Sequence, residues 1–244
     1  MSRGQADDPE AARLEADLLA WIAAAPAGFV ASGTTRVQRY GLEPDAGTRL
    51  ERDFETLAAR LFEFQYERVA VYRGYCDRRG VDPSHARRAA DIPALPVEAF
   101  KRARIATFGP EREHLQFHTS GTTATTAGVL HLDATALYDL ALERGFRHHV
   151  VPDRERIRML ILAAAPAESP HSSLGYMFER LRLRWGTPES ATLWRAGRIQ
   201  WRALRAGLES AVAARTPVCL LGTAFAWAQV LHTAASEDFA VALP

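Results

Sequence analysis

The segment FHTSGTTATTAGVLHLD, residues 117–133, places a cluster of small hydrogen-bonding residues directly ahead of an apolar run. The cluster consists of Thr119, Ser120, Gly121, Thr122 and Thr123. Hydroxyls and backbone N–H groups gathered in this way can bind an anion, and Gly121 lets the backbone approach that anion closely. The same residue types also form ordinary surface turns. Whether the cluster is an anion-binding loop or a surface turn has to be judged from the surrounding sequence.

A regular alternation of apolar and helical patterns after residue 115 predicts the framework that would position this cluster. We expect strands at 128–133, 157–165, 191–194 and 217–221, and helices at 134–149, 172–185, 198–214 and 223–235. Alternation of this kind is typical of a mainly parallel sheet flanked by helices. Ligands of such sheets bind beyond the carboxyl ends of the strands.

Small polar residues follow two of these predicted strands. Residues 165–173 come after the second strand and contain Ser172 and Ser173, whereas Gly222 and Thr223 come directly after the last strand. Each stretch leads into a helix, whose N-terminus offers unpaired N–H groups to a phosphate or carboxylate. Serine and threonine at these positions are equally suited to capping the helix.

The N-terminal part of the chain has a different pattern. Helical spacing predicts one helix over 9–25 and another over 48–75, separated by a turn-rich stretch, and residues 91–101 predict an extended connector that leads into a short helical turn. We therefore expect two domains, a helical N-terminal region at 1–90 and an α/β nucleotide-binding region at 91–244.

Composition excludes several classes of function. The formal net charge is +1 over 244 residues, so the sequence does not predict a nucleic-acid partner recognised by overall charge. No apolar run reaches the roughly 20 residues of a membrane span, and the N-terminus does not resemble a signal peptide, so we expect a cytoplasmic protein. The two cysteines lack metal-ligand spacing. Cys76 lies among arginines, which could lower the pKa of its thiol, whereas Cys219 falls in a predicted buried strand.

Four motifs, in order, resemble those of the LuxE-type acyl-protein synthetases, which belong to the adenylate-forming enzymes. Residues 119–123 resemble the TSGTT phosphate loop of that superfamily, and residues 92–101 resemble the IPxxPxxxFK segment that precedes it. Residues 172–177 resemble the S-S-L-x-Y-M segment, and residues 222–225 resemble G-T-x-F. The resemblance spans roughly residues 91–225.

The resemblance implies a fold, a reaction and a set of site residues. The chain would be the truncated N-terminal domain of an adenylate-forming enzyme, which activates a fatty acid with ATP and Mg2+ to an acyl-adenylate. The acyl group would then pass to a protein thiol and onward to an acyl reductase partner. By this resemblance Thr119, Ser120 and Thr122 would act in catalysis. The nucleotide would be held by Thr119, Ser120, Gly121, Thr122, Thr123, Gly222 and Thr223, and the substrate by Ser172, Ser173 and Tyr176.

The sequence also departs from the family pattern. The loop lacks the lysine that follows it in the wider superfamily, and His131 is the nearest titratable substitute, although a lone histidine on a strand is commonly a packed residue. Later family motifs have no counterpart before Pro244. The alternative interpretation is therefore a truncated or degenerate homologue that binds nucleotide or a partner acyl reductase without catalysis.

Overall fold

The computed structural model describes residues 8–25, 44–119 and 127–244 of the chain. The chain divides into two compact units, residues 1–145 and 146–244. The boundary falls inside helix α5 (Ala136–His149). The division into these two units reflects which residues pack together. The boundary predicted after residue 90 reflects instead where the sequence pattern changes.

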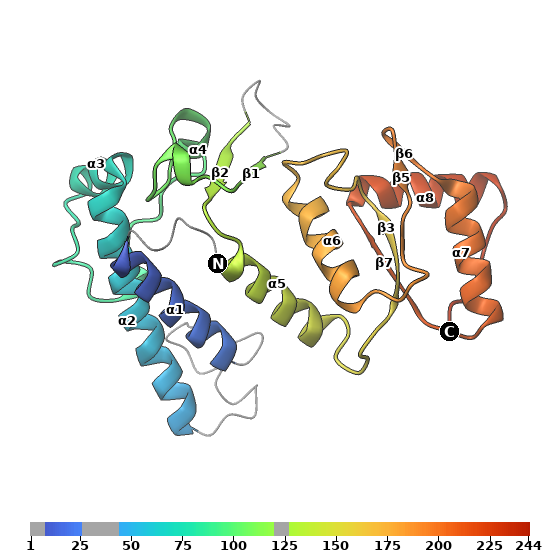
Figure 1. Cartoon of the computed structure of the whole chain (residues 1–244), viewed down its shortest axis with the longest axis horizontal. Coiled ribbons are helices and arrows are strands. Elements are labelled where there is room, and N and C mark those ends of the chain that lie inside the picture. The colour runs from blue at the N-terminus through green and yellow to red at the C-terminus, as the bar shows by residue number, and fades with distance from the viewer. Residues whose placement is uncertain (1–7, 26–43, 120–126) are drawn as a thin grey trace. The chain divides into compact units, whose positions relative to one another are not determined.

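The N-terminal unit begins with three helices, α1 (Pro9–Ala24), α2 (Pro44–Arg68) and α3 (Ala70–Arg78) (Figure 1). Helix α1 begins where expected because Asp8 caps it, its carboxylate accepting a hydrogen bond of 3.0 Å from the Ala11 N–H. The helical stretch predicted over 48–75 is confirmed, although it is divided into two helices. Val69 adopts an extended backbone conformation and separates α2 from α3.

A buried cluster joins α2 and α3 to the connector that follows them. Its fully buried members are Phe62, Val69, Tyr72, Cys76 and Ala86. Ile92, Leu95 and Ile105 pack against this cluster, and the Tyr72 hydroxyl donates a hydrogen bond of 2.8 Å to the Pro93 carbonyl. Short helical turns interrupt the connector at η2 (Ala89–Asp91), α4 (Ala99–Arg102) and η3 (Pro110–Arg112). The connector therefore belongs with the N-terminal helices.

An antiparallel hairpin follows, formed by β1 (Leu115–His118) and β2 (Val129–Leu132). The sequence predicts a strand at 128–133, and the structure confirms it. Its assignment to the parallel sheet is wrong, because β2 pairs with β1 instead. The four-residue run Leu115–His118 is too short to show a clear pattern in the sequence.

Glu113 anchors this hairpin to the connector. Its carboxylate accepts hydrogen bonds from the Arg104 guanidinium and the Gln116 side-chain amide, and its Oε2 lies 2.6 Å from Nδ1 of His131 on β2. These partners, Arg104 first, lower the pKa of Glu113 from its ordinary value near 4.5 to about 2. Arg112 forms a second link of 2.9 Å to Asp133, just after β2.

The C-terminal unit holds a three-stranded parallel sheet in the order β4-β3-β7. Its strands are β3 (Arg158–Leu162), β4 (Ala191–Thr192) and β7 (Val218–Gly222), and its helices are α6 (Ser173–Trp185), α7 (Trp201–Ala213) and α8 (Ala224–Ser236). A small hairpin of β5 (Trp194–Arg195) and β6 (Arg198–Ile199) precedes α7. The predicted alternation of strands and helices is thus confirmed as a small parallel sheet flanked by helices.

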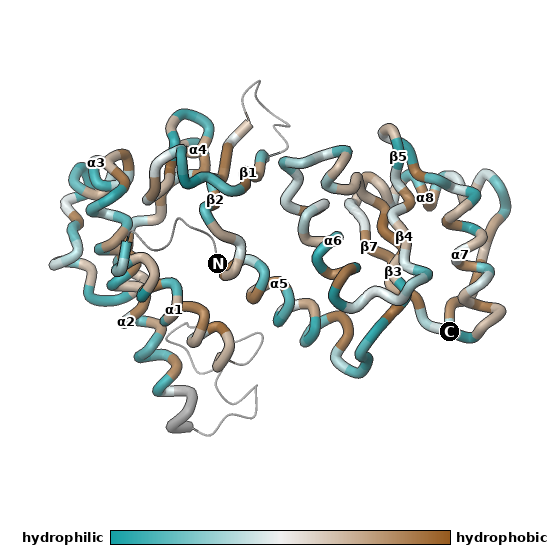
Figure 2. The backbone as a smooth tube through the Cα atoms, viewed as in Figure 1, coloured by the Kyte–Doolittle hydropathy of each residue, from teal (hydrophilic) through white to brown (hydrophobic). Residues whose placement is uncertain are grey.

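Strand β3 lies at the centre of this unit and is buried on both faces. Leu160 and Leu162 pack with Leu204 of α7 and Ala226 of α8 in one hydrophobic cluster. Successive strand residues point to opposite faces, and Figure 1 shows α6 and α7 on opposite sides of the strands. The helices alternate between hydrophilic and hydrophobic stretches, as amphipathic helices do (Figure 2). No helix in the described ranges is long and apolar enough to cross a membrane.

The Glu113 cluster gives a pH-dependent prediction. Because the folded-state pKa of Glu113 is depressed, its stabilising contribution is present above about pH 4.5 and is lost as the pH falls toward 2. Glu113→Gln should therefore lower the free energy of unfolding at pH 7, and its deficit relative to wild type should shrink between pH 4.5 and 2. Urea unfolding at a series of pH values measures this. The exposed Glu111→Gln is the control, and a deficit independent of pH would contradict the prediction.

Candidate functional site

Two hydrogen bonds close the base of the hydroxyl-rich segment. The Thr119 N–H donates to the Gly128 carbonyl at 2.9 Å, and the Gly128 N–H donates to Thr119 Oγ1 at 2.8 Å. Ser120, Gly121, Thr122 and Thr123 lie outside the residues that the structure describes. Thr119 Oγ1 accepts a hydrogen bond within the protein and keeps its own O–H for donation. The structure thus defines where the segment begins and ends.

The single lysine of the chain packs against this base. A Cβ atom added to Gly128 would lie 3.5 Å from Lys101 Cγ and 3.4 Å from both Oγ1 and Cγ2 of Thr119. Within the described ranges, the ammonium group of Lys101 has no ion pair or hydrogen bond. Sequence reasoning did not single out Lys101, although its position in the FK pair of a recognised motif was a signal.

His131 is not placed as a substitute for the loop lysine. Its Nδ1 lies 2.6 Å from Glu113 Oε2 and 2.7 Å from the Arg104 guanidinium, and only 12 % of its side chain is exposed. The ring is therefore committed to the cluster that anchors β2. This agrees with the packed-residue alternative.

One candidate at the end of β3, Ser172, has a clear structural role. Ser172 is the N-cap of α6, and its Oγ accepts a hydrogen bond of 3.0 Å from the Gly175 N–H. A Cβ on Gly175 would lie 2.8 Å from the Ala164 carbonyl oxygen, so glycine allows the first turn of α6 to approach the end of β3. Ser173 is the first residue of α6, and the Tyr176 N–H donates to the Ser172 carbonyl at 3.0 Å. Capping and close packing thus explain part of this motif.

The candidates at the end of β7 have comparable roles. Thr223 caps α8, its Oγ1 accepting a hydrogen bond of 3.1 Å from the Ala226 N–H. Gly222 lies opposite Leu162 in the register of β3 and β7, and a Cβ at this position would lie 2.9 Å from Leu162 Cβ. Glycine at 222 therefore has a packing reason, independent of any nucleotide.

The predicted site residues divide between the two units. Thr119 belongs to the N-terminal unit, and Ser172, Ser173, Tyr176, Gly222 and Thr223 belong to the C-terminal unit. In the C-terminal unit a hollow of about 360 Å³ lies beside β4, where its lining includes the Glu179–Arg182 ion pair (2.7 Å) and Thr192. Ser172 and Thr223 are not among the residues that line this hollow.

Neither cysteine has the surroundings of a reactive thiol. Cys76 is fully buried, and burial raises the pKa of its thiol by more than Tyr72 and Arg79 lower it. Burial likewise raises the pKa of Cys219 on β7. In the part of the chain that the structure covers, no group of three His, Cys, Asp or Glu side chains is arranged to hold a metal ion. Mg2+ therefore stays a prediction from the chemistry of ATP.

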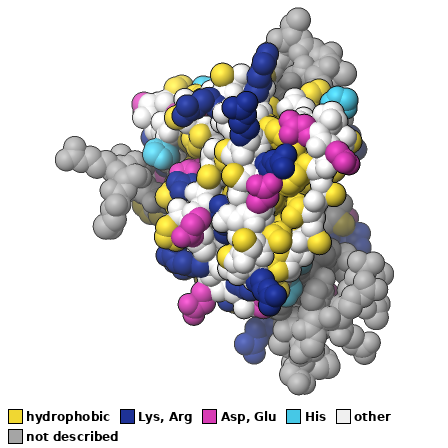
Figure 3. Space-filling model, turned by 90° about the vertical axis from the view of Figure 1, so that its right-hand side faces the viewer, with side chains coloured by type: hydrophobic (Ala, Val, Ile, Leu, Met, Phe, Trp, Pro, Cys, Tyr) yellow, Lys and Arg dark blue, Asp and Glu magenta, His cyan; other side chains and the backbone are white. Residues whose placement is uncertain are grey.

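On the side of α7, the surface of the C-terminal unit carries a mixture of hydrophobic and charged side chains. Figure 3 shows hydrophobic side chains between basic and acidic ones on this face.

Comparison of the chain with protein-family models, with curated proteins and with solved structures finds no match.

The close approach at Gly222 gives a second prediction. Gly222→Ala should destabilise the C-terminal unit by about 1–3 kcal/mol, because the added methyl group overlaps Leu162 at the sheet. Thermal or urea unfolding followed by circular dichroism measures the change. Thr223→Ser, which keeps the capping oxygen, is the matched control and should unfold like wild type. An unchanged midpoint for Gly222→Ala would show that glycine is not required for packing.

Proposed function

We propose that this chain activates an aliphatic carboxylic acid with ATP and forms an acyl-adenylate. One observation carries the proposal: the hydroxyl-rich segment is closed at its base by Thr119 and Gly128, with Lys101 packed against it. A segment rich in N–H and hydroxyl donors beside a cation suits a polyphosphate. The order of the four motifs and the parallel sheet flanked by helices support an adenylate-forming-like fold.

The proposed reaction explains why donors and a cation are needed. A carboxylate oxygen attacks the α-phosphorus of ATP, a bond forms between them, and the bond to pyrophosphate breaks. Two anions must approach each other, so hydrogen-bond donors directed at the phosphoryl oxygens lower the barrier as charge redistributes. We assign this role to the donors of residues 119–123 and assign Lys101 to charge balance. The roles of Ser172, Ser173, Tyr176, Gly222 and Thr223 toward nucleotide and substrate remain predictions from the resemblance.

The raised thiol pKa values of the two cysteines bear on which group accepts the acyl group. A thiol reacts as its thiolate, and burial raises the pKa of both Cys76 and Cys219. We therefore propose that the accepting thiol lies outside residues 1–244, for example on a partner acyl reductase. The same observation is compatible with the second candidate, a homologue that binds nucleotide or this partner without catalysis.

ATP–pyrophosphate exchange distinguishes these candidates. The purified chain should exchange labelled pyrophosphate into ATP only when a carboxylic acid is present, because exchange requires reversible formation of the adenylate. Saturated fatty acids and aryl acids should be compared at equal concentration. Nucleotide binding without exchange under any acid would favour the non-catalytic candidate, and absence of nucleotide binding would contradict both.

Two substitutions test the loop assignment. Gly121→Val should abolish ATP binding, because a β-branched side chain blocks the approach of the phosphates to the backbone. Lys101→Gln should slow exchange by about tenfold or more, since it removes a charge that offsets the phosphates. Arg102→Gln, on the same helical turn, is the matched control and should leave exchange unchanged. Retained ATP affinity in Gly121→Val would contradict the assignment.

A further inference from the structure

The N-terminal unit contains an apolar cavity of about 740 Å³. Its walls come from elements far apart in the sequence, including Leu18 of α1, Leu61 of α2, Leu95 of the connector, Phe100 of α4 and Leu130 of β2. This volume lies within the range of small-molecule binding sites. The cavity is therefore a candidate binding site in its own right.

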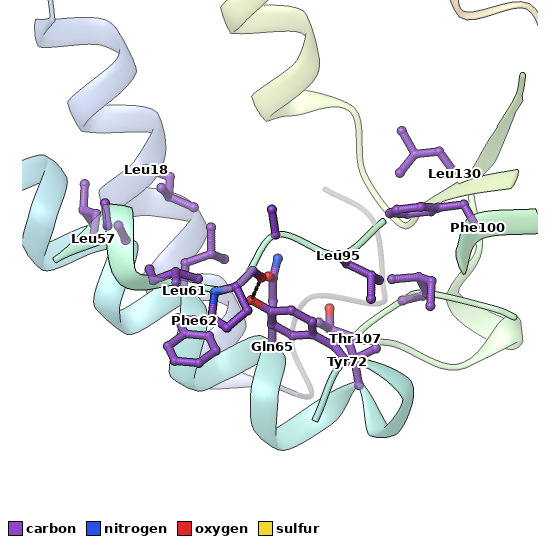
Figure 4. Close-up of a pocket in the computed structure, with 18 of the residues that line it drawn as sticks. Leu18, Leu57, Leu61, Phe62, Gln65, Tyr72, Leu95, Phe100, Thr107 and Leu130 are labelled. Carbon is purple, nitrogen blue, oxygen red and sulfur yellow. Dashed lines mark hydrogen bonds between the residues drawn. The ribbon is translucent and has the colours of Figure 1, made fainter. Parts of the chain in front are cut away.

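The cavity is elongated. In Figure 4 the labelled side chains extend from Leu18 and Leu57 at one end to Phe100 and Leu130 at the other, with Leu61 and Leu95 between them. An elongated space suits a chain-like ligand better than a compact ring system.

The lining is apolar along most of its length. No Asp, Glu, Lys or Arg is among its described lining residues, and the polar side chains are Gln65, Tyr72, Thr107 and His131. Tyr72 already donates its hydroxyl to the Pro93 carbonyl. A ligand enclosed by such walls must itself be largely apolar, because an unpaired polar group would lose its hydration without compensation.

The two ends of the cavity have different surroundings. At the end formed by Leu18 and Leu57, Trp21 packs against the same hydrophobic cluster and its ring lies 5.6 Å from that of Phe54, so this end is hydrophobic. At the other end, Phe100 directly precedes Lys101, and Leu130 lies two residues after Gly128. The end near β2 is thus close to the base of the hydroxyl-rich segment, against which the Lys101 side chain packs.

We propose that this cavity binds the aliphatic chain of an amphiphilic carboxylate, with the tail toward α1 and the carboxylate toward β2. The inference concerns binding alone and holds whether or not the chain forms an adenylate. If the proposed function also holds, the cavity delivers the carboxylate to the base of residues 119–128.

A chain-length series in the absence of ATP tests the proposal. Octanoate, dodecanoate and hexadecanoate should displace a fluorescent fatty acid from the purified chain with increasing affinity. Full burial of each added methylene corresponds to about fourfold in affinity, from about 0.8 kcal/mol per group. We expect at least a tenfold gain from octanoate to dodecanoate. Absence of saturable binding, or affinity independent of chain length, would overturn the proposal. Because no nucleotide is present, the result is separate from the exchange assay.

A filled cavity gives a matched pair of variants. Ala58 on α2 lines the cavity, whereas its neighbour Ala59 is exposed and does not. Ala58→Trp should lower dodecanoate affinity at least tenfold because indole occupies the space, and Ala59→Trp should bind like wild type. Unfolding curves of both variants verify that each is folded. Equal affinity of the two folded variants would place the ligand elsewhere and overturn the proposal.

The proposed orientation of the ligand, with its carboxylate toward β2, has a separate test. This test also examines binding in the cavity if Ala58→Trp does not fold. Leu130 is 42 % exposed, so Leu130→Glu should be tolerated. The new charge should weaken dodecanoate at least fivefold while affecting dodecanol less, because only the carboxylate is repelled near β2. Equal losses for acid and alcohol would overturn the proposed orientation, and no loss for either would remove Leu130 from the site.

Discussion

The mutual hydrogen bonds of Thr119 and Gly128 are the constraint on which the proposed site depends. They hold two residues that are nine apart in sequence at one point, so the polar segment between them starts and ends at a fixed place. The hairpin is in turn fixed to the connector, because Glu113 contacts both Arg104 of the connector and His131 of β2. A loop whose ends are fixed loses less conformational entropy when it binds a ligand than one with free ends. The hairpin and its charged cluster thus fix the positions of Thr119 and Gly128 relative to the connector.

Several residues that resemble a nucleotide site also have a full explanation in the fold. Ser172 and Thr223 cap helices, and Gly175 and Gly222 permit close contact between the ends of the sheet and neighbouring chain. A helix that begins at a strand end needs a capping hydroxyl and often a small residue. A ligand-binding site at the same place would use the same residue types, so their presence does not distinguish the two. Residues of this kind therefore give weaker support to a function than Lys101, for which the fold offers no partner among the residues described.

Sequence reasoning was most successful where a pattern is local. Helices 172–185 and 223–235 were placed within one residue at each end, because their caps and apolar spacing lie within the segment itself. The sequence-based predictions failed where contacts between distant segments determine the structure. The strand at 128–133 gives no local sign of whether it pairs with a parallel sheet or with the short run at 115–118, and the break at Val69 depends on packing around Tyr72. The cavity could not have been predicted, because its lining comes from residues between Leu18 and His131 that only the fold brings together.

The proposed binding of a triphosphate at residues 119–128 is tested most directly by hydrogen–deuterium exchange with and without ATP. Slower exchange on ATP addition is predicted for peptides that cover 115–133, with the largest effect between Thr119 and Gly128. The same peptides should be unaffected in the Gly121→Val variant. Protection that is absent from this region in the wild-type chain at saturating ATP, or that is unchanged by Gly121→Val, would contradict a phosphate-binding role for the segment.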